Sequence, residues 1–209
     1  MSVIKREPEI AIRYIGSISD ETSTEAQAIK NIMVACDNDF VPPLSWREKA
    51  SGAIGDQNLH APDIRPYWLE ILAQKNIVAL AEDGEVVAFM SFKSKYAHPE
   101  YFPDVVKEGD GINYISTICV LSDYRRFGIT RRFYEMMEEN LPPSVHGECV
   151  STRTWATNDG HIRLLEKRGY VLTYTIPEDR VLDTGEKLDT VYFCKRLASS
   201  IGQGGNYND

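Results

Sequence analysis

The stretch VLSDYRRFGITRRFYEMMEEN, residues 120–140, combines residue types and spacing suited to binding an anion. A strand-like run ends here, arginines flank Gly128, and a pattern of helical spacing begins at once. The first N–H groups of a helix lack partners within it, and the helix dipole favours negative charge beside them. Gly128 would let a phosphate approach the backbone, while Arg125 and Arg126 would add positive charge. The stretch indicates a phosphate site, with a solvated basic surface as the alternative.

Elements before this turn are predicted from periodicity and turn residues. Residues 9–15 alternate as a strand, and a helix follows with Thr22 or Ser23 as its cap. One face of that helix is predicted to be buried through Ile29, Ile32, Met33 and Cys36. A short helix is expected over residues 45–53 and a second helix from near Pro66. The run NIVALAEDGEVVAFMSFKSKY predicts a hairpin with a two-residue type I′ turn at Asp83-Gly84.

Elements after the hairpin surround the turn at Gly128. INYISTICVL, residues 112–121, is rich in β-branched residues and predicts a central strand, and the helix after Gly128 buries Ile129, Phe133 and Met136 or Met137. GECVSTRTWA predicts the next strand, and NDGHIRLLEKRGY a short helix that Gly169 ends from the C′ position. VLTYTI and DTVYFCKRL complete an antiparallel pair. This order predicts a single mixed α/β domain over residues 9–197, with flexible tails at 1–8 and 198–209.

Composition and charge narrow the class of protein. The 209 residues have a formal net charge of 23 − 31 = −8, which argues against a nucleic-acid binder and favours cationic partners. Neither a signal peptide nor a membrane-spanning run is apparent, so a cytoplasmic protein is expected, and its four cysteines should be reduced, buried thiols. The four histidines lack H-x-x-x-H spacing, so no metal site is expected.

Two motifs in order carry a family resemblance. The chain resembles the GNAT superfamily of N-acetyltransferases, whose signature is a strand, Q/R-x-x-G-x-G/A and a helix; here the signature is Arg125-Arg126-Phe127-Gly128-Ile129-Thr130. NDGHIRLLEKRGY is similar to the family's N-x-x-A-x-x-L-Y-E-K-x-G-F, with matches at Asn158, Leu164, Glu166, Lys167, Gly169 and Tyr170. The resemblance implies a central mixed, mostly antiparallel sheet of about seven strands flanked by about four helices.

The resemblance also implies a site for acetyl-CoA as co-substrate. Backbone amides around Arg126–Thr130 would hold the pyrophosphate, and main-chain groups of Ile118, Cys119 and Val120 would pair with the pantetheine arm where this strand separates from the next. Asn158 would bond the arm from the other side, or act only as a helix N-cap.

Two departures from the family pattern affect the expected chemistry. Thr130 replaces a small Gly or Ala, and Leu165 stands where many members have a tyrosine that protonates the leaving thiolate. The strand offers no carboxylate as general base. Asp110, acting through water, and Tyr114 are the weak candidates, since an Asp in EGDG suits a turn and a phenol has an ordinary pKa near 10.

The expected function is direct transfer of an acetyl group to a primary amine of a small cationic molecule, without a metal, nucleic acid or membrane as partner. A non-catalytic CoA-binding module and an acyltransferase using a longer acyl-CoA are the alternatives, and a homodimer is an open possibility. Cationic acceptors are favoured by two insertions rich in acidic and aromatic residues: Asp37, Asp39, Glu100, Asp104, Glu108 and Asp110, with Phe40, Trp46, Tyr101 and Phe102. An ordinary solvated acidic rim is the other interpretation of these residues.

Overall fold

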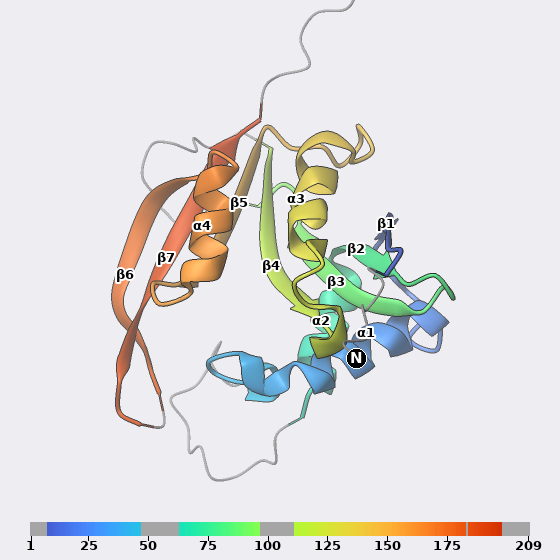
Figure 1. Cartoon of the computed structure of the whole chain (residues 1–209), viewed down its shortest axis with the longest axis horizontal. Coiled ribbons are helices and arrows are strands. Elements are labelled where there is room, and N and C mark those ends of the chain that lie inside the picture. Colours follow the sequence, from blue (N-terminus) through green and yellow to red (C-terminus); the bar gives the residue numbers. More distant parts are fainter. Residues whose placement is uncertain (1–7, 47–62, 97–110, 183, 198–209) are drawn as a thin grey trace, which may run out of the picture.

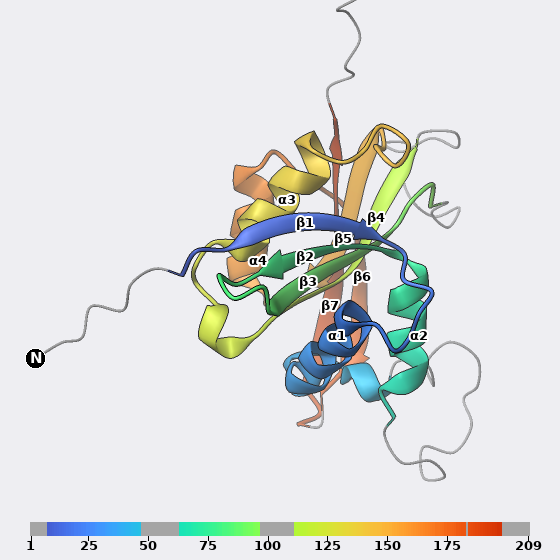
Figure 2. The same ribbon diagram turned by 90° about the vertical axis from the view of Figure 1, so that its right-hand side faces the viewer.

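One sheet organises the part of the chain that the computed structural model describes, residues 8–46, 63–96, 111–182 and 184–197. Its strands are β1 (Ala11–Gly16), β2 (Lys75–Leu80), β3 (Val86–Lys93), β4 (Ile112–Val120), β5 (Cys149–Trp155), β6 (Val171–Val181) and β7 (Lys187–Arg196). Their order is β1-β2-β3-β4-β5-β7-β6, and β4 and β5 are the parallel pair in this otherwise antiparallel sheet. Figure 2 shows β1–β3 running across the direction of β5–β7, so the sheet is strongly twisted.

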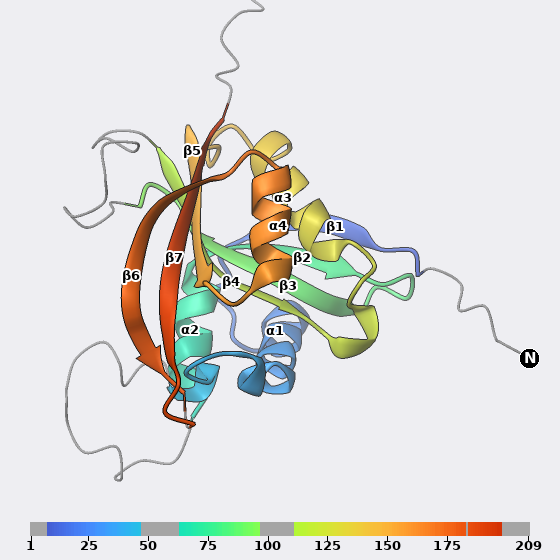
Figure 3. The same ribbon diagram turned by 60° about the vertical axis from the view of Figure 1, so that its left-hand side comes forward.

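Helices cover both faces of the sheet. They are α1 (Thr24–Ala35), α2 (Arg65–Ala73), α3 (Ile129–Glu139) and α4 (Asp159–Lys167), with short 3₁₀ turns η1 (Asp37–Asp39) and η3 (Ser122–Tyr124). Helices α1 and α2 lie on one face, and α3 and α4 on the other (Figures 1 and 3). Seven strands and four α-helices in the described residues confirm the expected mixed fold.

Each face has its own hydrophobic core. The core on the α1/α2 face includes Ile29, Ile32, Met33, Cys36, Trp68, Ile71, Val78, Phe89 and Cys119. The core on the α3/α4 face includes Met90, Ile115, Phe133, Tyr134, Met137, Val150, Leu165, Tyr170 and Phe193. Alternate residues of the central strands therefore enter different cores, which explains why INYISTICVL is apolar along most of its length.

The helix signals in the sequence are confirmed where the structure describes them. Ser23 caps α1 by accepting a hydrogen bond from the Ala26 amide at 3.3 Å. The predicted stripe on α1 is buried, and α2 begins at Arg65 with a proline in its first turn. Gly169 follows α4 with a φ of 82°, a left-handed conformation that favours glycine. The short helix expected over residues 45–53 lies mostly outside the described residues.

The hairpin turn differs from the sequence prediction. The Ala81 amide donates to the Glu85 carbonyl, and the Gly84 amide donates to the Ala81 carbonyl, so the loop is Glu82-Asp83-Gly84. Gly84 has a positive φ of 85°, whereas Asp83 is not among the left-handed residues. The predicted two-residue type I′ turn is therefore wrong. A three-residue loop needs only one left-handed residue, and Asp83 instead accepts a hydrogen bond from the Glu85 amide at 3.0 Å.

A bulge in β4 shapes the centre of the sheet. Ile115 pairs with Phe92 and Thr117 pairs with Ser91, so Ser116 is an extra residue in β4. On the other side, β4 and β5 pair only as far as Ile115 and Thr152. Because a bulge bends its strand and increases the local twist, β4 leaves β5 at this point. Residues 116–120 therefore have no pairing with β5.

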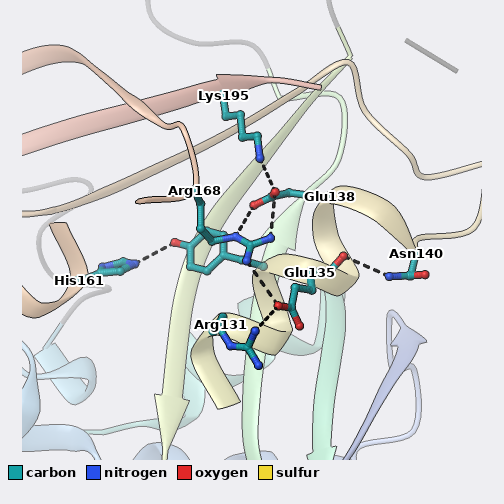
Figure 4. Close-up of polar contacts among 8 residues, drawn as sticks. Arg131, Glu135, Glu138, Asn140, His161, Arg168 and Lys195 are labelled. Carbon is teal, nitrogen blue, oxygen red and sulfur yellow. Dashed lines mark hydrogen bonds and ion pairs between the residues drawn. The ribbon is translucent and has the colours of Figure 1, made fainter. Parts of the chain in front are cut away.

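A buried ionic cluster ties α3, the end of α4 and β7 together (Figure 4). The Glu138 carboxylate, whose side chain is 3% exposed, accepts from Arg168 at 2.9 and 3.0 Å and from Lys195 at 2.5 Å. Burial alone would raise the pKa of Glu138, but the hydrogen bonds from Arg168 and Lys195 outweigh it and lower the pKa.

We expect Glu138→Gln to lower the free energy of unfolding by about 2–4 kcal/mol, because it removes the buried counter-charge of Lys195 and leaves Arg168 with only the longer contact to Glu135. Urea denaturation at pH 7 measures this change. Glu135→Gln is the matched control, since Glu135 lies on the same helix and contacts Arg131 and Arg168 from a side chain that is 33% exposed. The control should change stability by less than about 1 kcal/mol. Equal effects of both substitutions would contradict the structural role of the cluster.

Candidate functional site

The loop between β4 and α3 has an unusual backbone. After η3, Arg126 and Gly128 have positive φ values of 69° and 72°, and the helix begins at Ile129. A left-handed conformation is disfavoured for arginine, so tertiary structure holds the loop in this shape. Such alternation of backbone conformation turns successive N–H groups toward one side and forms a concave anion site.

Four amides at the start of α3 are available to a ligand. Arg132 is the first residue whose N–H is accepted within the helix, by the Gly128 carbonyl at 3.1 Å, and no side chain caps the helix. The N–H groups of Gly128, Ile129, Thr130 and Arg131 therefore lie at an uncapped positive helix end. Gly128 is exposed, and Phe127 and Thr130 are half-buried. The predicted phosphate-binding residues thus come together in a geometry suited to a phosphate.

The side chain of Arg125 has a structural connection that the sequence did not indicate. Its guanidinium donates to the Val120 carbonyl at 3.0 Å and to Asp39 at 2.5 Å, which joins the loop to the end of α1. Cys36 lies beside it, and the hydrogen bond with Cys119, followed by that with Arg125, lowers the pKa of the Cys36 thiol to about 7 against the effect of burial. Arg125 therefore positions the loop in this structure, and the neighbouring Arg126 is exposed.

The outer end of β4 provides the strand part of the site. Ile118, Cys119 and Val120 all lie beyond the last pair with β5, as the expected contact with an extended ligand requires. Cys119 turns its thiol into the core on the α1/α2 face. The Val120 carbonyl already accepts from Arg125 and from the Cys36 thiol at 3.7 Å. Main-chain pairing with a ligand is therefore better suited to Ile118 and Cys119 than to the Val120 carbonyl.

Asn158 is the N-cap of α4. Its side-chain oxygen accepts from the His161 amide at 3.3 Å, and its amide nitrogen donates to Thr154 at 3.0 Å. The capping interpretation is confirmed. Contact with a bound ligand remains a prediction, for which the exposed position of Asn158 leaves room.

Neither candidate for the general base gains support from the structure. Tyr114 is buried on β4, and desolvation raises its pKa well above the ordinary value, so loss of its proton near neutral pH is strongly disfavoured. Asp110 lies outside the described residues. Leu165, in the position of the family tyrosine, is fully buried in the core on the α3/α4 face.

A tyrosine from another helix lies near that position. The Tyr134 hydroxyl on α3 is 2.8 Å from Nε2 of His161 on α4 (Figure 4 shows His161). Burial raises the pKa of Tyr134, and a smaller effect of the hydrogen bond with Thr152 lowers it. Thr152 is the last β5 residue paired with β4. The sequence could suggest neither contact, because the pair depends on how α3 and α4 pack.

A group on the opposite face was also missed. Arg153 follows Thr152 on β5 and donates to the Tyr192 hydroxyl at 3.3 Å. Tyr114 and Tyr192 form a buried aromatic cluster with Tyr96, Tyr174 and Ile176 packed against it. Alternation along ECVSTRTW places Arg153 on the face of Cys149 and Ser151, and this was the signal available in the sequence.

The acidic residues expected to attract a cationic acceptor are only partly described. Asp37 accepts hydrogen bonds from the Ser45 amide and hydroxyl at 2.8 and 2.9 Å, and Asp39 pairs with Arg125. Both carboxylates are therefore engaged within the protein. The other four acidic residues, with Tyr101 and Phe102, lie outside the described residues.

Other expected properties can be compared with the described residues. None of the four cysteines forms a disulfide, and all four are buried. Among the described residues, no group of three or more His, Cys, Asp or Glu side chains is placed to hold a metal ion. No described helix has both the length and the apolar character needed to cross a bilayer.

Comparison with known proteins identifies the family. Residues 43–170, more than half of the chain, match the model of the acetyltransferase (GNAT) family. The chain belongs to the GNAT acetyltransferase family. No curated protein matches the chain. The matched region includes the loop at Gly128 and the whole of α4, the two segments on which the sequence resemblance rested.

Solved structures share the GNAT fold. An Escherichia coli alanine N-acetyltransferase of a ribosomal protein has a TM-score of 0.56 and 17% identity over 96% of this chain and 99% of its own. Salmonella typhimurium yncA, solved with its cofactor acetyl-CoA, has a TM-score of 0.57 and 18% sequence identity, over 93% of this chain and 98% of its own. Arabidopsis thaliana NAA60, solved with a bisubstrate analogue, has a TM-score of 0.60 and 14% sequence identity, over 90% of this chain and 100% of its own. At such low identities, these GNAT structures establish the fold alone.

The contact between α3 and α4 predicts a pH-dependent stability. Burial lowers the pKa of His161 to about 4, compared with about 6.5 in an unfolded chain. Between these values the unfolded state binds a proton that the native state does not, so stability falls as pH falls from about 6.5 toward 4. Urea midpoints measured from pH 7 to 4.5 should therefore fall more for wild type than for His161→Gln. Parallel curves for the two proteins would contradict the buried, neutral imidazole.

Proposed function

We propose that this GNAT protein is an acetyl-CoA-dependent N-acetyltransferase that moves the acetyl group directly to a primary amine. The supporting observation is the continuous arrangement of an unpaired β4 segment, a loop with two left-handed residues and an uncapped helix end. Main-chain groups of β4 would bind the amide-containing pantetheine arm, and the amides of residues 128–131 would bind the pyrophosphate. The proteins of similar fold that are solved with acetyl-CoA or a bisubstrate analogue lend further support.

The residues of the chain would act by positioning and by polarisation. Bringing amine and thioester together supplies a large part of the acceleration expected of an acyl transfer. A backbone amide in the segment Thr117–Cys119 would stabilise the oxyanion that forms at the carbonyl carbon. The neutral amine attacks the thioester carbonyl and forms the C–N bond, and collapse of the oxyanion then breaks the C–S bond and releases the CoA thiolate. The proton that the amine loses passes to solvent or to that thiolate, since the raised pKa of Tyr114 makes it a poor base.

The proposed acceptor is a primary amine. A preference for cationic amines was expected from six acidic residues, of which four are not described and two, Asp37 and Asp39, are already bonded within the protein. The described residues therefore give that preference no support.

Substitution at Gly128 tests the cofactor site. Asn and Asp have the same size and both tolerate a left-handed backbone, so Gly128→Asn and Gly128→Asp differ mainly in charge. We expect the Asp variant to bind acetyl-CoA at least about tenfold more weakly than the Asn variant by calorimetry, because its carboxylate would face the pyrophosphate.

Pantetheine is the matched control ligand, since it lacks the phosphates and should not distinguish the two Gly128 variants. Equal affinities of the Asn and Asp variants for acetyl-CoA would show that the pyrophosphate binds elsewhere.

Turnover tests the transferase assignment. Free CoA should appear when acetyl-CoA is mixed with a panel of primary amines, at a rate well above that without an amine, and a mass increase of one acetyl group should appear on the acceptor. Butyryl-CoA in the same assay tests the longer-acyl alternative and should react more slowly. Binding of acetyl-CoA without turnover on any amine would favour the non-catalytic module.

A further inference from the structure

Arg153 occupies a special position on β5. The preceding residue, Thr152, is the last on this strand that pairs with β4, so Arg153 is the first residue beyond the point where the two strands separate. The Thr152 side chain forms a hydrogen bond with Tyr134 on the α3/α4 face. Because successive side chains of a strand point to opposite faces, Arg153 points to the other face of the sheet. There it opposes Tyr192 across the β5–β7 ladder and donates to its hydroxyl.

Tyrosines surround this guanidinium. Tyr114 on β4 and Tyr192 on β7 are each 7–8% exposed, and the Tyr96 ring stacks on Tyr114 with centroids 4.7 Å apart. Tyr174 on β6 lies 6.3 Å from Tyr192, centroid to centroid. On the α2 side, the Tyr67 hydroxyl bonds Thr117 next to the bulge. The surface around Arg153 thus combines aromatic rings, hydroxyl groups and one permanent positive charge.

No carboxylate of the described residues forms an ion pair with Arg153, although its side chain is exposed. The carboxylate whose charge acts on Arg153 is that of Asp179, which accepts from Thr190 at 2.5 Å and contacts Arg180. Of the five N–H donors of a guanidinium, one is used by Tyr192, and the planar fork left over matches a carboxylate. In a protein of net charge −8, such a cation is the feature that would draw an anionic group to this face.

We propose that Arg153 binds a carboxylate of the acceptor, so that the acceptor is an amine that also carries an acid group, as amino acids do. This inference rests on the proposed acetyltransferase function. The Tyr192 and Tyr114 phenols would complete the anion site, and the rings of Tyr96 and Tyr174 would cover the carbon skeleton of the acceptor. The amine is thereby held at the opening between β4 and β5, where the thioester end of the cofactor is expected.

The position of Arg153 separates this anion site from the phosphate loop. The loop follows Val120, five residues beyond the Ile115–Thr152 pair, which is about 16 Å along an extended strand. Arg153 is therefore assigned to the acceptor and not to the pyrophosphate. A substitution here should change KM for the acceptor and leave KM for acetyl-CoA unchanged.

Matched acceptors test the proposal on the full chain. Amino acids and the corresponding amino acid amides present the same amine with and without a carboxylate, and each pair is compared at equal concentrations of neutral amine. For wild type, kcat/KM should be about 10- to 100-fold higher for the acid, the range expected of a charged hydrogen-bonded contact. Arg153→Gln should abolish that preference, Arg153→Lys should retain part of it, and Arg13→Gln, on β1, should leave it unchanged.

Direct binding decides the case even when no amine of the panel is a substrate or when Arg153→Gln fails to fold. N-acetylated amino acids should raise the melting temperature of wild type more than their amides do, with Arg153→Lys giving a smaller difference. Equal responses to acids and amides in wild type would overturn the proposal, as would an Arg153 effect confined to KM for acetyl-CoA. Failure of acetyl-CoA to bind wild type would instead overturn the proposed function, because the carboxylate measurement uses no cofactor.

Discussion

The separation of β4 from β5 is the constraint on which the candidate site depends. Two parallel strands pair for four residues and then part, which exposes main-chain groups in the middle of a sheet. Such exposure is normally confined to sheet edges, because shielding unpaired N–H and C=O groups from water destabilises the fold. An extended ligand that inserts between the strands supplies the missing partners, and the opening is in that sense a binding site made by the backbone.

The opening persists because other contacts hold each strand separately. β4 is fixed on its other side by β3, and the Ser116 bulge is held by hydrogen bonds from its hydroxyl to Gln74 at 2.5 Å and to the Ser91 carbonyl at 3.2 Å. β5 pairs with β7 along its whole length. At the closed end, the Glu138 cluster joins α3 to β7, so the two halves of the sheet cannot drift apart where they do pair. Rigid support on both sides keeps the opening from collapsing into a continuous ladder.

Local sequence signals predicted the parts of this arrangement that depend on local chemistry. The strand before Gly128, the uncapped helix after it, the cap at Asn158 and the stop at Gly169 each follow from residue types a few positions apart. The signals failed where the outcome depended on partners far away in the chain. Nothing in INYISTICVL marks Ser116 as a bulge, because the bulge is defined by the register with β3. The sequence predicts a phosphate contact for Arg125, because its actual partner, Asp39, is 86 residues away and no local pattern connects the two.

The same limitation explains why acidity was interpreted as a preference for cationic acceptors. Composition reports the total charge, whereas binding depends on which charges remain uncompensated at the site. Asp37 is bonded to Ser45 and Asp39 forms an ion pair with Arg125, while Arg153 has no ion pair with a carboxylate among the described residues and lies among tyrosines. Aromatic rings that border an exposed guanidinium lower the local polarity on that side, which strengthens its attraction for an anion that fits beside it. A single cation in this setting can therefore decide the substrate of a protein whose net charge has the opposite sign.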